Sequence, residues 1–393
     1  MRKNLALEQL NPYKGAPPLE QIREHYGLDR VVKLASNECP EQPFPEVIEA
    51  IEAAASGLNR YPDGGWRDLR EALGEHWNVD PASVVLGNGS CDLLLALARA
   101  TLMPGTEFVF PWPSFVIYST MAEGALAVQV PVPLVDFKHD LRAMEAAVND
   151  NTHLVVVCNP NNPTGTYLQA KEVRRFIEAM PADLTVALDE AYIEYVETED
   201  EDTTQWIYEF PNLVIFRTFS KAYGLAGLRV GYALADEPLV TALNKMRQPF
   251  NLNTLAQVAA VEALRHKERL QERTRRVWRE RDRIEDELGG MGLQPVPTEA
   301  NFIVFHADGL TVPPEEAAQA LMERGVLIRS GYALGMPGYL RVTVGTAEEN
   351  RLFLDTMRQF LPAPMDAGAA SEGEGLEEDA PTMKEEAQRL QGV

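Results

Sequence analysis

Three apolar segments that end in polar residues, together with the lysine-containing stretch Thr218–Tyr232, constrain the fold of this 393-residue chain most strongly. Their Val, Leu and Ile residues do not alternate with polar ones, which is typical of strands buried on both faces, as in a parallel sheet covered by helices. Ligands bind such sheets beyond the carboxyl ends of the strands. The sequence therefore predicts a site at one sheet edge. The segments that contribute residues to it are Val84–Leu94, Leu154–Gly165, Leu184–Tyr195 and Thr218–Tyr232.

Lys221 lies between a short β-type run and a glycine-rich turn, in TFSKAYGLAGLRVGY. A lysine amine becomes a covalent catalyst only when it is sequestered and partly deprotonated. Ser220 precedes it, and Arg229 follows after a turn that can return the planar guanidinium to the same cavity as a phosphate ligand. A lone Ser-Lys pair is more often solvated. Together with the other segments, it indicates a Schiff-base lysine.

A glycine turn precedes the helix expected after Val84–Gly87. Gly89 permits close backbone approach, and the amides of Gly89, Ser90 and Cys91 can hold a dianionic phosphate at the helix start. The GNGSCD stretch lacks the third glycine of a dinucleotide fingerprint.

Phe115 follows another short strand, where a ring can stack on a planar ligand, although core packing is the alternative.

Together these motifs resemble the fold-type I aminotransferases that use pyridoxal 5'-phosphate (PLP), and in detail the histidinol-phosphate aminotransferases, over about Asn11 to Leu361. Lys33–Pro40 is similar to the family's Ser-Asn-Glu-Asn-Pro signature, except that Cys39 replaces the second Asn. The resemblance implies an α/β fold with a mostly parallel central sheet between helices, a smaller α+β C-terminal domain and an N-terminal arm. It also implies a homodimer.

The resemblance assigns roles to the polar residues at the strand ends. Lys221 forms the Schiff base and shuttles a proton, while Asp189 keeps the pyridine nitrogen protonated. Tyr192 and Asn162 reach the ring oxygen. Tyr61 reaches the phosphate of the neighbouring subunit.

Substrate recognition is expected from Tyr13, Asn37, Arg329 and Arg341, again by resemblance. Two arginines suit an anionic amine, although surface salt bridges are the alternative for either. The expected reaction is histidinol-phosphate:2-oxoglutarate amino transfer in histidine biosynthesis, in two half-reactions. An aromatic or broad-specificity aminotransferase, a phospho-amino-acid decarboxylase and a non-catalytic PLP-binding protein are the alternatives.

Composition excludes other classes of protein. The net charge of −23, without a clustered basic face, argues against a nucleic-acid partner. Three cysteines without a CxxC motif suit a reducing cytosol, and the six histidines lack metal-ligand spacing, so no metal is expected. No run of about 18 apolar residues occurs. We therefore expect a cytoplasmic protein without membrane contact.

The predicted organisation is an N-terminal arm (1–30), a large PLP-binding domain (31–260), a small C-terminal domain (261–361) and an acidic, disordered tail (362–393). Several local expectations accompany it. A single amphipathic helix is predicted over 255–288, with solvated arginines at 265–283 that pair within the helix. The acidic segment 194–202 is predicted to be solvated, and 325–330 to be one strand.

Overall fold

The structure of the chain is a computed structural model that describes residues 17–362. Tyr13, most of the predicted arm and nearly all of the predicted tail lie outside these residues. The helices are α1 (Leu19–Tyr26), α2 (Pro45–Ala54), α3 (Arg67–Trp77), α4 (Ser90–Thr101), α5 (Ile117–Ala125), α6 (Leu141–Ala147), α7 (Ala170–Ala179), α8 (Glu237–Met246), α9 (Thr254–Leu264), α10 (Lys267–Gly290), α11 (Pro314–Met322) and α12 (Ala347–Arg358).

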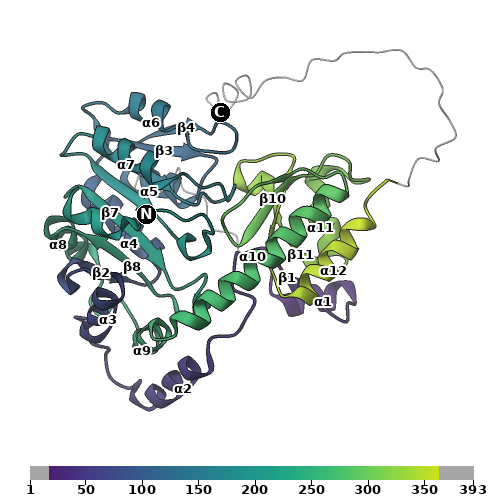
Figure 1. Cartoon of the computed structure of the whole chain (residues 1–393), viewed down its shortest axis with the longest axis horizontal. Coiled ribbons are helices and arrows are strands. Elements are labelled where there is room, and N and C mark those ends of the chain that lie inside the picture. Colours follow the sequence, from purple (N-terminus) through teal and green to yellow (C-terminus); the bar gives the residue numbers. More distant parts are fainter. Residues whose placement is uncertain (1–16, 363–393) are drawn as a thin grey trace, which may run out of the picture. The chain divides into compact units, whose positions relative to one another are not determined.

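A seven-stranded sheet has the order β2-β8-β7-β6-β5-β3-β4 (Figure 1). Neighbouring strands are parallel except around β8, which is antiparallel to both β2 and β7. All six residues of β7 and all five of β8 are buried, as is typical of central strands covered on both faces. The strands are β2 (Val84–Gly87), β3 (Glu107–Trp112), β4 (Val128–Pro133), β5 (Thr152–Cys158), β6 (Thr185–Asp189), β7 (Leu213–Thr218) and β8 (Gly231–Ala235).

Two smaller sheets contain the remaining strands. An antiparallel sheet has the order β12-β13-β10-β9, and β1 pairs in parallel with β11. Helix α10 contacts β9, β10 and α12, and it also contacts the short 3₁₀ helix η4 (Ile193–Tyr195), which follows β6. The strands are β1 (Val32–Lys33), β9 (Pro295–Val296), β10 (Phe302–His306), β11 (Val326–Leu327), β12 (Arg329–Ser330) and β13 (Tyr339–Thr343).

Two predicted elements are divided in the structure. The helix expected over 255–288 is two helices, α9 and α10, because the backbone at His266 leaves helical geometry (φ −105°, ψ 50°). There the His266 ring packs edge-on against Phe44, and its Nε2 lies 3.0 Å from Glu262. The strand expected over 325–330 is also divided, because β11 pairs with β1 whereas β12 pairs with β13.

The prediction that the arginines of α10 are solvated was wrong for two of them, since Arg273 and Arg281 are buried. Arg273 donates to the backbone oxygens of Ala222 and Gln42, so it joins α10 to the turn that follows Lys221. The acidic segment was also predicted incorrectly at its start. Both carboxylate oxygens of Glu194 are buried, and burial raises the pKa of this carboxyl to about 7.

No helix among residues 17–362 is both long enough and apolar enough to cross a membrane.

Candidate active site

The Lys221 side chain lies at the turn after β7, partly buried. Its Nζ donates to the backbone oxygen of Ser36 at 3.3 Å and lies 5.4 Å from the centre of the Tyr192 ring. Burial lowers the pKa of the Lys221 amine to about 8, and the positive charges of Arg341 and Arg229 lower it further. An amine with this pKa is partly unprotonated near neutral pH, as a nucleophile or general base requires.

Asp189 ends β6 and is 2% exposed. Its Oδ2 accepts a 2.8 Å hydrogen bond from the Tyr118 hydroxyl, whereas Oδ1 is buried and has no partner among residues 17–362. Burial raises the pKa of the Asp189 carboxyl to about 6, against the hydrogen bond from Tyr118, which lowers it. A buried carboxylate oxygen without a donor is costly, so Oδ1 is available for a cationic N–H group.

Tyr192 is held by Asn37, which comes from the segment after β1. Asn37 Nδ2 donates to the Tyr192 phenol oxygen at 2.9 Å. The backbone of Asn37 adopts a positive φ of 54°, and its N–H donates to Thr343 Oγ1 at 2.9 Å. Burial raises the pKa of Tyr192, so the phenol keeps its proton. Because Asn37 fills an acceptor position on the oxygen, the phenol hydrogen is left to donate elsewhere.

Arg341 extends from β13 toward the loop after β5. It donates to Asn162 Oδ1 at 2.5 Å and to the backbone oxygen of Ala35 at 3.0 Å, and its buried Nε has no partner in the described residues. Arg329 is its register partner on β12. Burial lowers the pKa of the Arg341 guanidinium to about 10, and the charge of Arg329 lowers it further. The two arginines on adjacent strands are therefore close enough for their positive charges to interact.

A backbone cradle forms where α4 begins. Gly89, the N-cap, has a φ of 85°, and a Cβ there would lie 2.5 Å from Nη2 of Arg229. Arg229 Nη1 in turn donates to Ser220 Oγ at 3.3 Å. A Cβ on Gly231 would lie 2.4 Å from the backbone nitrogen of Ser90. Glycine permits these close approaches because it has no Cβ. The N–H groups at the start of α4, the Ser220 hydroxyl and the Arg229 guanidinium therefore lie around one space.

Phe115 and Tyr61 are placed differently. Phe115 is half-buried and meets the Tyr118 ring edge-on at 5.9 Å, beside the partner of Asp189. Tyr61 is 81% exposed and stacks on Phe250 at 4.6 Å. Among the described residues, no cluster of His, Cys, Asp and Glu could hold a metal ion.

Residues 29–357 match the model of a protein family described as aminotransferase class I and II. The chain belongs to this family. Histidinol-phosphate aminotransferase 2 of Carboxydothermus hydrogenoformans is 41% identical over 358 residues, which are 91% of this chain and 98% of that protein. An aromatic amino acid aminotransferase of Mycobacteroides abscessus is 45% identical over 329 residues, 84% of this chain and 93% of its own length.

A solved structure agrees with this membership. The histidinol-phosphate aminotransferase of Sinorhizobium meliloti, in complex with pyridoxal-5'-phosphate, superposes with a TM-score of 0.84 at 29% identity, covering 91% of this chain and 98% of that one. The fold class and the enzyme class predicted from the sequence are confirmed. The protein is a PLP-dependent aminotransferase.

The residues of this aminotransferase fit PLP in two independent ways. The buried, unpartnered Asp189 Oδ1 can accept a protonated ring nitrogen. At the cradle, Gly89 and Gly231 leave the helix amides and Arg229 without an intervening Cβ, which suits a phosphate.

Two residues that position the site of the aminotransferase were missed from the sequence. Tyr118, which donates to Asp189, lies three residues after Phe115, and Thr343, which binds Asn37, lies two residues after Arg341. Residues two apart on a strand share a face, so that periodicity gave a usable signal for Thr343. Tyr118 lies inside α5, whereas Phe115 precedes it, so no helical spacing joins the two in advance.

Proposed function

We propose that this aminotransferase transfers the amino group of histidinol phosphate to 2-oxoglutarate, as in histidine biosynthesis. The observation that carries the proposal is the register pairing of Arg329 with Arg341. Histidinol phosphate and 2-oxoglutarate each carry an anionic group remote from the reacting carbon, and a pair of guanidinium groups suits such groups. The names of the relatives support the same substrate.

The site residues would hold different parts of PLP. Asp189 Oδ1 would hold the pyridine nitrogen, and Ser220, Arg229 and the backbone amides of Gly89, Ser90 and Cys91 would hold the phosphate. Phe115 would stack on the ring. When bound, PLP supplies a protonated ring that withdraws electrons from the carbon that bears the transferred amine.

Lys221 would attach to the cofactor and, once displaced by the substrate amine, take the proton from the substrate Cα at Nζ. Its lowered pKa suits this proton transfer. Tyr192 would donate its remaining phenol hydrogen to the ring oxygen, because Asn37 already donates to the phenol oxygen. Asn162, held by Arg341, would bind beside the same oxygen. Lys221→Ala should abolish turnover while PLP is still bound.

An amine panel tests the substrate. With 2-oxoglutarate as acceptor, glutamate formation should give a higher kcat/KM for histidinol phosphate than for phenylalanine. The aromatic amino acid aminotransferase relative makes the opposite result the specific alternative. A higher kcat/KM for phenylalanine would replace the proposed substrate with an aromatic amino acid.

We also propose a cytoplasmic homodimer in which Tyr61 binds the phosphate held by the partner subunit. The exposure of the Tyr61–Phe250 pair supports this arrangement. A Tyr61→Ala chain mixed with a Lys221→Ala chain should regain activity, because one site of the heterodimer then receives both intact residues. Failure to regain activity in a verified heterodimer would refute the shared site.

We also propose the domain division predicted from the sequence. It consists of a large domain (31–260) and a small domain (261–361), with an arm before them and an acidic tail after them. The separate seven-stranded and four-stranded sheets support it. Tyr13 is proposed to close over the substrate from the arm. Truncation after Leu361 should leave turnover unchanged.

A further inference from the structure

A buried ion pair lies directly behind the active-site carboxylate. Arg217, on β7, and Glu190, immediately after β6, have side-chain exposures of 2% and 1%. Arg217 Nε donates to Glu190 Oε2 at 2.8 Å, and Thr203 Oγ1 donates to Glu190 Oε1 at 2.7 Å. Both carboxylate oxygens of Glu190 are therefore bonded inside the protein.

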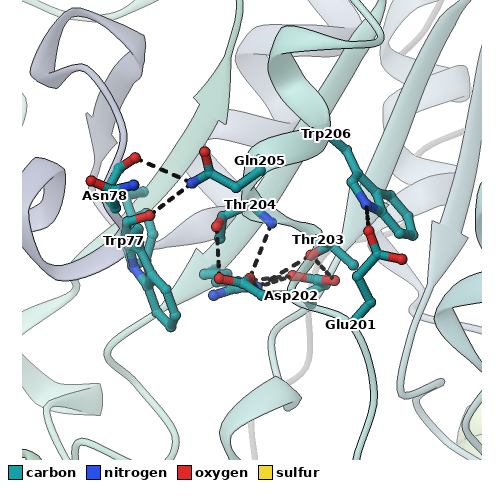
Figure 2. Close-up of polar contacts among 11 residues, drawn as sticks. Trp77, Asn78, Glu201, Asp202, Thr203, Thr204, Gln205 and Trp206 are labelled. Carbon is teal, nitrogen blue, oxygen red and sulfur yellow. Dashed lines mark hydrogen bonds and ion pairs between the residues drawn. The ribbon is translucent and has the colours of Figure 1, made fainter.

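The 3₁₀ helix η5 (Thr203–Tyr208) contacts both members of the pair through Thr203, whose Oγ1 also accepts from Arg217 at 3.3 Å. Figure 2 shows Thr203 beside Asp202 and Thr204. The Asp202 carboxylate caps η5 through Thr204 and lies 3.5 Å from Arg217. Gln205 donates to the backbone oxygen of Trp77. The Trp77 ring lies 4.2 Å from the guanidinium carbon of Arg217. The pair is thus enclosed on several sides by polar contacts and an aromatic face.

The pair is connected to the active site through the backbone. Asp189 is the register partner of Phe216, and the N–H of Glu190 donates to the backbone oxygen of Phe216 at 2.8 Å. Consecutive strand residues project to opposite faces, so Glu190 is anchored away from the face that Asp189 presents. Arg217 lies four residues before Lys221. The pair therefore ties the strand end that carries Asp189 to the strand that leads to Lys221.

We propose that Glu190 and Arg217 form a positioning pair that fixes the Asp189 carboxylate for the cofactor nitrogen, with Arg217 offsetting the negative charge that Glu190 places beside it. Neither residue is required to touch the cofactor. The inference rests on the proposed role of Asp189.

The charges in this region indicate that Glu190 and Arg217 affect Asp189 differently. Besides burial, the negative charge of Glu190 contributes to the raised pKa of Asp189. Burial alone would lower the pKa of Arg217, but Glu190 and the other acidic neighbours raise it above its ordinary value, so Arg217 stays charged. Loss of Arg217 leaves the Glu190 carboxylate uncompensated beside Asp189. Loss of the Glu190 charge removes the repulsion between Glu190 and Asp189, but it also removes the ion pair with Arg217.

The test measures the Kd for PLP and the visible absorbance of the bound cofactor, on folded protein, for Arg217→Met, Glu190→Gln and the double variant. We expect Arg217→Met to weaken PLP binding by roughly tenfold or more and to shift the absorbance, and Glu190→Gln to have a smaller effect. The double variant should return toward the wild-type values, which keeps the test informative if Arg217→Met folds poorly.

Arg281→Met is the matched control, because Arg281 is also buried and pairs with Glu197 at 3.0 Å. It should lower Tm without changing PLP affinity. A Kd for PLP within twofold of wild type in Arg217→Met, with an unshifted absorbance, would overturn the positioning role. Asp189→Asn separates the two failures: if it too leaves PLP binding unchanged, the proposed role of Asp189 itself is wrong.

Discussion

Two buried arginines at strand positions have opposite surroundings. Arg217 meets a carboxylate, a hydroxyl and an aromatic face inside the protein. Arg341 also lies over an aromatic ring, that of Phe302, but its hydrogen-bond acceptors are neutral, Asn162 and the backbone of Ala35, and its Nε has no partner in the described residues. Burial lowers the pKa of Arg341 to about 10, whereas the negative charge of Glu190 helps to raise the pKa of Arg217 above its ordinary value despite its burial. Arg217 therefore has a carboxylate partner within the fold, whereas Arg341 has none among residues 17–362, which is consistent with its proposed role in binding an anionic substrate.

The largest expected effect is on stability at Arg217. Arg217→Met should lower the free energy of unfolding by about 3 to 5 kcal/mol, because it leaves the Glu190 carboxylate buried and uncompensated. Urea denaturation measures this change. A loss equal to that of Arg341→Met would remove the distinction between the two arginines.

The next effect is on activity at Arg341. Arg341→Met should lower kcat/KM by about tenfold to a hundredfold for every substrate, since one charge-assisted contact contributes about 1.5 to 3 kcal/mol. Its stability should stay unchanged or rise, because a buried cation without a carboxylate partner is removed. Steady-state kinetics and urea denaturation on the same preparation test both parts. Strong destabilisation would show that Arg341 is structural.

A narrower effect is expected at the register partner of Arg341. Arg329→Ala should lower kcat/KM for histidinol phosphate by roughly tenfold, and for phenylalanine far less, because only the former carries a remote anion. The control is Arg341→Met, which should impair both amines. Equal losses on Arg329→Ala would favour the aromatic aminotransferase.

The smallest effect is on the titration of Lys221. PLP attachment to the apoprotein should accelerate as pH rises through about 8, because the unprotonated amine is the nucleophile. Arg341→Met should move this midpoint upward by removing a positive charge, whereas Arg217→Met should leave it in place. Stopped-flow absorbance follows the attachment, and an unmoved midpoint in Arg341→Met would contradict the coupling.

The same lowered pKa affects folding. Between about 8 and the ordinary lysine value of 10.5, the unfolded chain binds more protons at Lys221 than the folded chain does. The contribution of Lys221 to stability should therefore rise with pH across this window. Lys221→Met should remove that part of the pH dependence.

The strands and their terminal residues could be predicted from sequence because unbroken apolar runs identify strands buried on both faces, and a parallel sheet brings their ends together. The sequence analysis expected Asp189 and Lys221 at such strand ends, and in the structure Asp189 ends β6 and Lys221 follows β7. The burial of Arg273 could not be predicted, because its contacts are the backbone oxygens of Ala222 and Gln42, which are remote in sequence. Charge patterns along α10 contain no information about such partners.

Glu190 and Arg217 illustrate the same limit. Each adjoins a predicted motif, but their pairing depends on the alignment of β6 with β7. The local sequence predicts which residues lie at the end of a strand. It does not predict which residues of other segments they contact. At the helix break, the His266 ring likewise packs edge-on against Phe44, a residue that is remote in sequence.

Gly231 has a consequence for how such a site can change. It is the register partner of both Gly87 on β2 and Thr218 on β7, and it lies against the backbone of Ser90. The glycine cradle and the lysine turn therefore share one strand as a common spacer. Because β8 pairs with both β2 and β7, a displacement of β8 would move the glycine cradle and the lysine turn together.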